Sequence, residues 1–132
     1  MSTLIDTNAF DYINVLDKAA DASWLRNEAI ANNIANVDTP NYKRQDVNFE
    51  DALARALKWT HLNDLDGQVD KVNMRRLSVS THVDSEGFSY RVDGNNVDID
   101  TENAELASNQ IKYNGLSNCI SSEFKNLQSV MK

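Results

Sequence analysis

Two histidines and one cysteine are the side chains of this sequence that catalysis would use most readily. His61 and His82 have no nucleophile or metal-ligand partner at a recognisable spacing. Cys119 precedes Ile120 in an amphipathic segment, where a free cysteine usually behaves as a small hydrophobic residue. A single cysteine also excludes an internal disulfide and any multi-cysteine zinc site. The sequence therefore predicts no catalytic centre, and we expect the protein not to be an enzyme.

The acidic stretch DGNNVDIDTE invites comparison with a calcium-binding loop. If Asp98 is the first ligand, the loop requires glycine and glutamate where this sequence has Asn103 and Asn109. A tight turn followed by a helix capped by Asp100 or Thr101 explains the stretch better. No Gly-rich phosphate loop occurs. We therefore expect no metal and no cofactor.

Length and charge restrict the function further. A chain of 132 residues most simply forms one domain over residues 1–132. Its formal net charge of −7 argues against nucleic-acid binding, because phosphate contacts need concentrated Lys and Arg. No apolar run approaches the roughly 20 residues that span a bilayer, which predicts no direct membrane insertion. The first residues lack the basic and apolar blocks of a secretory signal, so we expect any export to use another route.

Two long segments have the period of amphipathic helices, with positions that recur at alternating spacings of three and four. In residues 8–36, which contain no Gly or Pro, these positions are Ile13, Leu16, Ala20, Ser23, Asn27, Ile30 and Ile34. In residues 100–131 they are Asn103, Leu106, Gln110, Tyr113, Ser117, Ile120, Phe124, Leu127 and Met131. We predict that the two helices pack against each other as a coiled-coil-like pair.

Both helical stripes are partly polar. A buried polar residue at such a position can fix the register of a helix pair, or it can lie at the wet edge of the contact. Gly115 is either a tolerated weak point of the second helix or a place of close approach. In each case a helix pair with half-polar contact faces is marginal alone, which predicts association with other chains.

The intervening residues 37–99 have a different pattern. One short helical turn is expected within residues 46–59. Apolar and polar residues alternate over residues 77–83 and 88–92, with Gly87 between them, which predicts a β-hairpin. The predicted fold class is therefore mainly α, with two long terminal helices and a short irregular or β-hairpin middle region.

The end of the first helix leads into an arm with an unusual composition. We expect Asn36 to end the helix in a left-handed conformation and Pro40, the only proline, to fix an extended exit. Asn41 tolerates positive φ better than most residues, so a tight turn is possible there. The arm that carries Tyr42 and Phe49 either packs on its own chain or binds a neighbouring subunit.

Two motifs in this chain resemble those of a known family. The first contains Asn32, Asn33, Asn36, Thr39, Pro40 and Tyr42. The second contains Asp93, Gly94, Asn95, Val97, Asp98, Asp100 and Glu102. In this order, and each beside a long terminal helix, they resemble the signatures of bacterial flagellar rod, hook and related axial proteins. The short chain and the continuation from Tyr42 to Phe49 are most similar to the proximal rod members.

This resemblance implies a structural subunit of the proximal rod of the flagellar basal body, which assembles helically and transmits torque. It implies as partners copies of the chain itself, a FliE-type adaptor, FlgC-type proximal rod proteins and the flagellar type III export apparatus, used without a cleaved signal peptide. It also favours a neighbouring subunit as the partner of the arm. The alternative is a helical-hairpin secretion substrate or adaptor that forms a discrete dimer.

Overall fold

The computed structural model describes residues 8–60, 63–75, 77–84 and 91–131. The elements within these ranges follow the order α1 (Asn8–Ala35), β1 (Gln45–Val47), α2 (Glu50–Lys58), α3 (Leu65–Lys71), β2 (Thr81–Val83) and α4 (Ile99–Val130). The mainly helical fold class with an antiparallel strand pair in the middle is confirmed. Among the described residues, no helix has a stretch that is long and apolar enough to cross a membrane.

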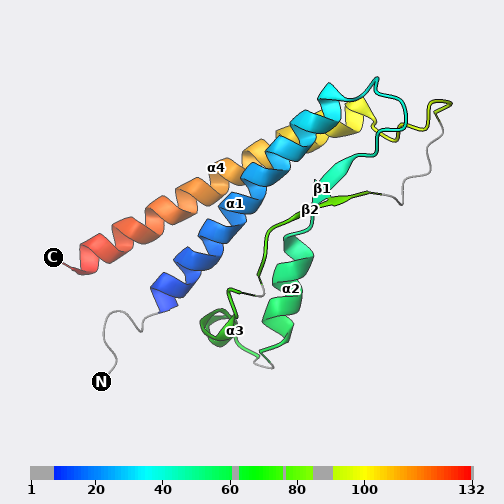
Figure 1. The fold of residues 1–132 in the computed structure, drawn as a ribbon. Coiled ribbons are helices and arrows are strands. Elements are labelled where there is room, and N and C mark those ends of the chain that lie inside the picture. Colours follow the sequence, from blue (N-terminus) through cyan, green and yellow to red (C-terminus); the bar gives the residue numbers. More distant parts are fainter. Residues whose placement is uncertain (1–7, 61–62, 76, 85–90, 132) are drawn as a thin grey trace.

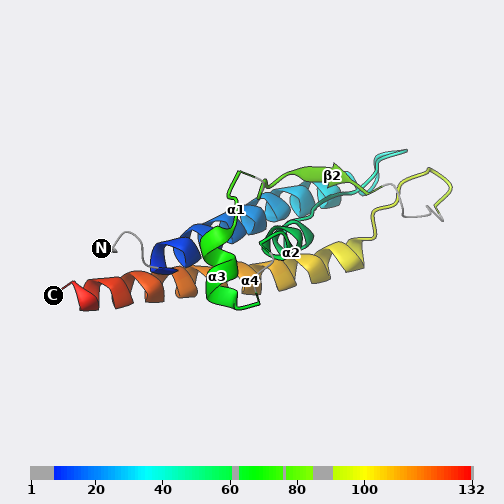
Figure 2. The ribbon, with the colours of Figure 1, turned by 90° about the horizontal axis from the view of Figure 1, so that it is seen from below.

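The two long helices run antiparallel and lie side by side (Figures 1 and 2). Asn109 of α4 donates from Nδ2 to the carbonyl oxygen of Ser23 at 2.8 Å, and nearer the start of α4 Glu102 contacts Asn33. The end of α1 therefore meets the start of α4, and the opposite ends of both helices lie together. We call the first of these ends the junction end and the other the distal end.

Helix α1 has two contact faces, of which the sequence predicted one. The predicted face contacts α4 and includes Ser23. The second face begins one residue away, at Ala22, and packs against the middle of the chain. Neighbouring residues of a helix point roughly 100° apart, so one helix can serve both partners. Ala22 forms a core with Val47, Phe49 and Leu77.

The contact face of α4 differs from the prediction at alternate positions. The buried or half-buried residues are Glu102, Leu106, Asn109, Tyr113, Leu116, Ile120, Glu123 and Leu127. The polar positions Asn103, Gln110 and Ser117 are exposed, as the wet-edge alternative expected. Phe124 and Met131 were predicted to pack in the pair, but they are 54% and 74% exposed, so this intrachain contact is wrong. A spacing of three and four residues does not determine which of two neighbouring positions faces the other helix. In α4 the buried hydrogen bonds of Glu102 and Asn109 determine it.

Gly115 lies on the exposed side of α4. A Cβ atom built at this position would meet no atom within 4 Å. The residue is therefore a tolerated weak point within this chain, and the close approach that was the other alternative does not occur in it.

The middle of the chain pairs its strands differently from the prediction. Strand β2 pairs antiparallel with β1, with Asp46 opposite His82. The predicted partner, residues 88–92, lies largely outside the described residues, and Val92 is in a turn. A local hairpin is favoured by sequence proximity alone, whereas β1 is held beside β2 by the contacts of α1 described below. The predicted helical turn is α2, and α3 was not predicted.

Phe49 belongs to this middle core rather than to an interface. Its side chain is buried among Ala22, Val47 and Leu77 of the same chain. The expectation that Phe49 needs a neighbouring subunit is therefore wrong, because α1 supplies the apolar surface that the arm lacks.

Leu77 has no exposed surface, so truncation at this position should leave a cavity in the middle core. We expect Leu77→Ala to lower the free energy of unfolding by about 2–5 kcal/mol, as for other large-to-small core changes. Leu65→Ala is the matched control, because Leu65 is exposed, and should change it by about 0.5 kcal/mol or less. Urea denaturation followed by circular dichroism measures both, and equal effects would contradict this core.

Candidate functional site

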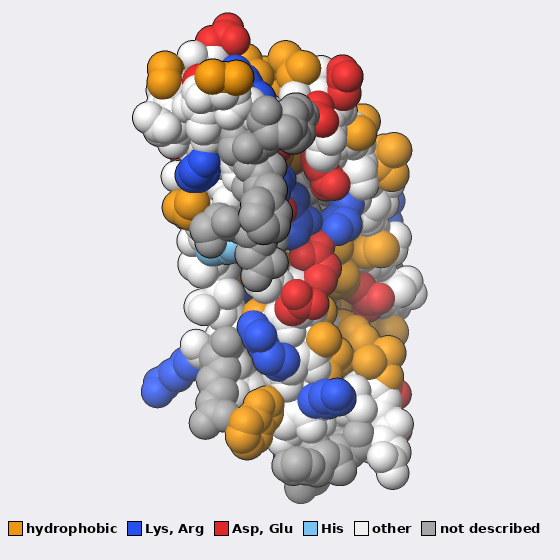
Figure 3. All heavy atoms as spheres, turned by 90° about the vertical axis from the view of Figure 1, so that its right-hand side faces the viewer, with side chains coloured by type: hydrophobic (Ala, Val, Ile, Leu, Met, Phe, Trp, Pro, Cys, Tyr) orange, Lys and Arg blue, Asp and Glu red, His pale blue; other side chains and the backbone are white. Residues whose placement is uncertain are grey.

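The two family-like motifs meet at the junction end of the molecule (Figure 1). The turn after α1 and the turn before α4 are joined there by side chains that we call the polar junction. Its members are Asn33, Tyr42, Arg44, Asn95, Asn96 and Glu102. Figure 3 shows the molecule from this side, where acidic and basic side chains lie next to one another.

Asn33 is fully buried and uses both ends of its amide. Its Nδ2 donates to the carbonyl oxygen of Gln45 at 2.8 Å and to Oε2 of Glu102 at 3.1 Å. Its Oδ1 accepts from the backbone N–H of Gln45 at 2.8 Å and from the Tyr42 hydroxyl at 3.3 Å. The Asn33 amide thus pairs with Gln45 as a neighbouring strand would. One side chain of α1 fixes both the start of β1 and the start of α4.

Glu102 is also fully buried, and its charge is balanced by Arg44. Arg44 donates from Nε to Oε1 of Glu102 at 2.8 Å and from Nη1 to Oδ2 of Asp84 at 2.9 Å. Burial alone would lower the pKa of Arg44, but its hydrogen bonds to Glu102 and Asp84 raise this pKa overall, so the guanidinium stays charged. A buried charge persists only where it is paired and hydrogen-bonded, and this geometry meets that requirement.

Asn95 closes the turn after α1 from the other motif. Its buried Nδ2 lies 2.9 Å, 3.0 Å and 2.9 Å from the carbonyl oxygens of Asn36, Val37 and Thr39. Its Oδ1 accepts from the N–H of Val97 at 2.7 Å. These three carbonyls belong to the turn that follows α1, because the helix ends at Ala35. Backbone N–H groups of the same turn satisfy the last carbonyls of the helix itself, as Asn36 does for Asn32 at 3.1 Å. Asn95 therefore caps the turn after α1.

Asn96 fixes the arm next to this cap. Its Oδ1 accepts from the backbone N–H of Arg44 at 2.7 Å, and its Nδ2 donates to the carbonyl oxygen of Asp84 at 2.9 Å. Asn95 and Asn96 are neighbours in the second motif, but Asn95 binds the turn after α1 and Asn96 binds the arm at Arg44.

Two residues with positive φ face each other across the junction, Asn41 at 62° and Gly94 at 78°. The N–H of Asn41 donates to the carbonyl oxygen of Asp93 at 2.8 Å, and Lys43 donates to the carbonyl oxygen of Gly94. Glycine is favoured at position 94 by its positive φ, and a Cβ there would lie 2.6 Å from Oδ1 of Asn41, so the Asn41 side chain would also have to move. Asn36 was expected to adopt the left-handed conformation, but among the described non-glycine residues only Asn41 does so.

The remaining motif residues act locally. Asp98 caps α4, because its Oδ1 accepts from the N–H groups of Asp100 at 3.0 Å and Thr101 at 3.4 Å. The cap therefore lies two residues before the predicted Asp100. At the end of α1, exposed Thr39 donates from Oγ1 to Oδ1 of Asn36 at 3.1 Å, and Asn36 Nδ2 donates to the carbonyl oxygen of Asn32 at 2.8 Å. Pro40 is exposed, and Val97 is buried.

Sequence reasoning placed Glu102 in the second motif and Arg44 in the continuation of the first, but it gave neither of them, nor Asn96, a role in the site. Tyr42 was included, but as an interface residue, and it is half-buried against its own chain. Burial, and after it the charge of Glu102, raise the pKa of Tyr42. The available signal was the presence of two cations, Lys43 and Arg44, beside the first motif and of several carboxylates in the second, at places that the antiparallel helices bring together.

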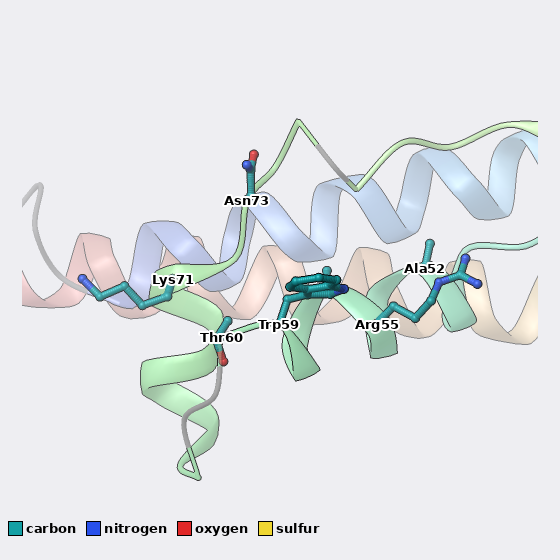
Figure 4. Close-up of a pocket in the computed structure, with 7 residues that line it drawn as sticks. Ala52, Arg55, Trp59, Thr60, Lys71 and Asn73 are labelled. Carbon is teal, nitrogen blue, oxygen red and sulfur yellow. The ribbon is translucent and has the colours of Figure 1, made fainter.

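The residues considered for catalysis do not converge. His82 on β2 is exposed, and His61 lies outside the described residues. Cys119 on α4 is also exposed, so the expectation that it serves as a small hydrophobic residue is wrong. In the part of the chain that the structure describes, no group of three or more His, Cys, Asp or Glu could hold a metal ion. A hollow beside α2 and α3 is open, and Figure 4 shows Arg55 and Lys71 in it extending in opposite directions.

A second ionic link ties three helices together at Glu50, the first residue of α2. Arg26 of α1 donates to Oε1 at 2.9 Å and to Oε2 at 2.6 Å, and Lys112 of α4 donates to Oε1 at 2.6 Å. Arg26 also donates to the carbonyl oxygen of Val47 at 2.7 Å. The hydrogen bonds from Arg26, more than those from Lys112, lower the pKa of Glu50 to about 2.

The Asn33 contacts lead to a direct test with two neighbouring residues. Asn33→Asp removes both Nδ2 donors and places a second carboxylate beside buried Glu102, so we expect a loss of about 3 kcal/mol or more in the free energy of unfolding at pH 7. Asn32→Asp makes the same change at an exposed position and should cost about 1 kcal/mol or less, through the helix dipole alone. Urea denaturation compares them, and similar losses would contradict the polar junction.

The Glu50 link should depend on pH in a defined window. Because the folded pKa of Glu50 is lowered from 4.5 to about 2, its stabilisation is present above pH 4.5 and is lost as the pH falls toward 2. We expect the free energy of unfolding of the unchanged protein to exceed that of Glu50→Gln by a constant amount above about pH 5, and the two to converge near pH 2. Urea titrations at a series of pH values test this, and a difference independent of pH would refute it.

Comparison of the sequence with known proteins identifies its family. Residues 13–43, which include Asn33 and the turn after α1, match the family model described as flagella basal body rod protein. The chain is 34% identical to the flagellar basal body rod protein FlgB of Bacillus subtilis (strain 168), in an alignment that covers 90% of this chain and 92% of that protein. It is 38% identical to the FlgB of Borreliella burgdorferi, with 85% and 89% covered, and 36% identical to that of Borrelia hermsii, with 91% and 95% covered. The identity and coverage of these relatives show that the chain is a member of the FlgB family of flagellar basal body rod proteins.

Proposed function

We propose that this protein is a structural subunit of the proximal flagellar rod, which assembles helically with copies of itself and transmits torque through packed helices. Family membership supports a place in the basal body rod. The observation that carries the finer proposal is the exposure of large apolar side chains along the two long helices. They are Phe10, Trp24, Ile111, Phe124, Val130 and Met131.

The polar and apolar parts of the molecule are unevenly distributed along the helix pair. At the junction end, buried polar atoms are paired within the chain, as described for Asn33 and Glu102. At the distal end, Phe10, Phe124 and Met131 line an open, largely apolar hollow. A soluble monomer rarely exposes a large contiguous apolar surface. The distal end is therefore the part of the molecule that needs neighbouring chains.

The predicted packing residues divide between these two roles. Ile13 and Ile30 are buried in the chain, and the half-buried residues are Leu16, Ile34, Leu106, Tyr113, Ile120 and Leu127. We propose that Phe124 and Met131, which the chain leaves exposed, contact other subunits. Copies of the chain, FlgC-type rod proteins and a FliE-type adaptor are the proposed neighbours, reached after flagellar type III export.

A substitution on the exposed distal face should separate assembly from folding. Phe124→Ser removes a side chain that is 54% exposed, so we expect the free energy of unfolding to fall by about 2 kcal/mol or less and the variant to stay folded as judged by circular dichroism. Incorporation into basal bodies and swimming motility should be lost or strongly reduced in cells that carry only this variant. Val92→Ser is the control, because Val92 is fully exposed in the turn before α4.

Normal motility of Phe124→Ser, with normal amounts in purified basal bodies, would contradict the proposed role of the distal face. A discrete dimer of the unchanged protein that never adds further subunits would favour the alternative, a helical-hairpin adaptor. Sedimentation velocity over a range of concentrations distinguishes a closed dimer from an open series of oligomers.

A further inference from the structure

Exposed carboxylates surround Trp24 on one face of α1. Asp17, Asp21 and Glu28 share this face with Trp24 because they are spaced four and three residues apart. Trp24 is 64% exposed. Among the described residues, none of the three carboxylates has an ion-pair partner. We call these four residues the acidic stripe.

The acidic stripe borders a groove between α1 and α4. The Trp24 ring lies 6.4 Å from that of Tyr113, centroid to centroid, and Phe124 lines the same groove. Aromatic faces beside carboxylates favour a cationic side chain, which gains both an ion pair and a cation–π contact. The groove therefore suits a basic partner segment that ends in Arg or Lys and carries apolar surface.

This chain has a segment of that chemistry at the end of α2. Arg55 and Lys58 are exposed, and neither has an ion-pair partner among the described residues. Lys71 of α3 lines the same hollow as Arg55, with Asp70 as its neighbour at 3.5 Å. Trp59, which is 68% exposed, supplies apolar surface between Arg55 and Lys71 (Figure 4). We call Arg55, Lys58, Trp59 and Lys71 the basic patch.

The two surfaces lie on opposite sides of α1. The middle of the chain, which carries the basic patch, packs on the face that contains Ala22 and Arg26. At roughly 100° per residue, Asp17, Trp24 and Glu28 point to the other side of the helix. The basic patch of one molecule therefore cannot reach its own acidic stripe, and contact between the two surfaces requires a second molecule.

We propose that the basic patch of one copy binds the acidic stripe of the next copy. This contact is head-to-tail, since it joins different surfaces of the two copies and leaves one of each free for further addition, as an open helical assembly requires. It also offsets the repulsion between copies that each carry a net charge of −7. The inference rests on the self-assembly proposed above and specifies the surfaces that carry it.

A charge exchange tests the contact with the full-length protein. Asp21→Lys and Arg55→Glu each place like charges across the proposed interface, so each should raise the concentration needed for self-association at least about tenfold, with each variant folded as judged by circular dichroism. The double variant D21K/R55E reverses the pair and should restore association to within about threefold of the unchanged protein. Glu105→Lys, an equal charge change at an exposed site on α4 outside both surfaces, should not weaken association.

Cysteine crosslinking provides a second readout. In a Cys119→Ser background, a chain with Asp21→Cys and Arg55→Cys should give a ladder of oligomers under mild oxidation, whereas either cysteine alone should give at most dimers. Self-association without sensitivity to the charge changes, and without a ladder, would overturn this contact and leave self-assembly intact. An unchanged protein that stays monomeric at every concentration would overturn both the contact and the proposed self-assembly.

Discussion

Glu102 places a carboxylate where no part of its side chain reaches solvent, and the arrangement of the junction end follows from that constraint. A buried charge is costly unless a cation and further donors surround it. Arg44 supplies the cation from the arm, and Asn33 supplies a donor from α1. Arg44 can take this position only if the chain turns back after α1, which the left-handed residue Asn41 and its contact with Asp93 allow. The ends of two helices that are almost 70 residues apart are therefore held in one register by polar contacts.

The same constraint explains how a single chain can be ordered although it leaves apolar faces of its long helices exposed. In the polar junction, buried Asn33 and Glu102 find their hydrogen-bond partners within one chain, and the middle core around Phe49 and Leu77 covers one face of α1. At the distal end, the described residues include a link from α1 to α3, in which the Tyr12 hydroxyl donates to Oδ1 of Asp66, whereas Phe124, Val130 and Met131 of α4 stay exposed. A rod subunit benefits from this division, because the junction fixes the angle at which the helices leave it while their free faces remain for neighbouring chains. In this account the family motifs are structural devices of the single chain, and the interfaces lie elsewhere.

The periodic parts of the fold could be predicted from the sequence, and the polar contacts could not. Spacings of three and four predicted both long helices, and α1 ends one residue before the predicted position. The face of α4 was misplaced at alternate positions because Glu102 and Asn109 are buried through specific hydrogen bonds, which hydrophobic periodicity does not detect. Strand β2 was given a local partner because pattern alone cannot reveal that Asn33 holds Gln45 in place for β1. Asn95 and Gly94 were identified by resemblance, but their tasks, holding the turn after α1 and allowing close approach to Asn41, required the structure.

Amide hydrogen exchange on the dilute monomer and on the assembled rod tests this account most directly. We predict that the monomer protects the second half of α1 and the first half of α4 most strongly, because the polar junction holds them, and that the distal turns of both helices exchange rapidly. In the assembled rod the distal turns should become protected as well. Protection in a proven monomer that is as strong at the distal turns as at the junction, or weakest at the junction, would contradict the claim that the polar junction orders this chain and neighbouring subunits complete it.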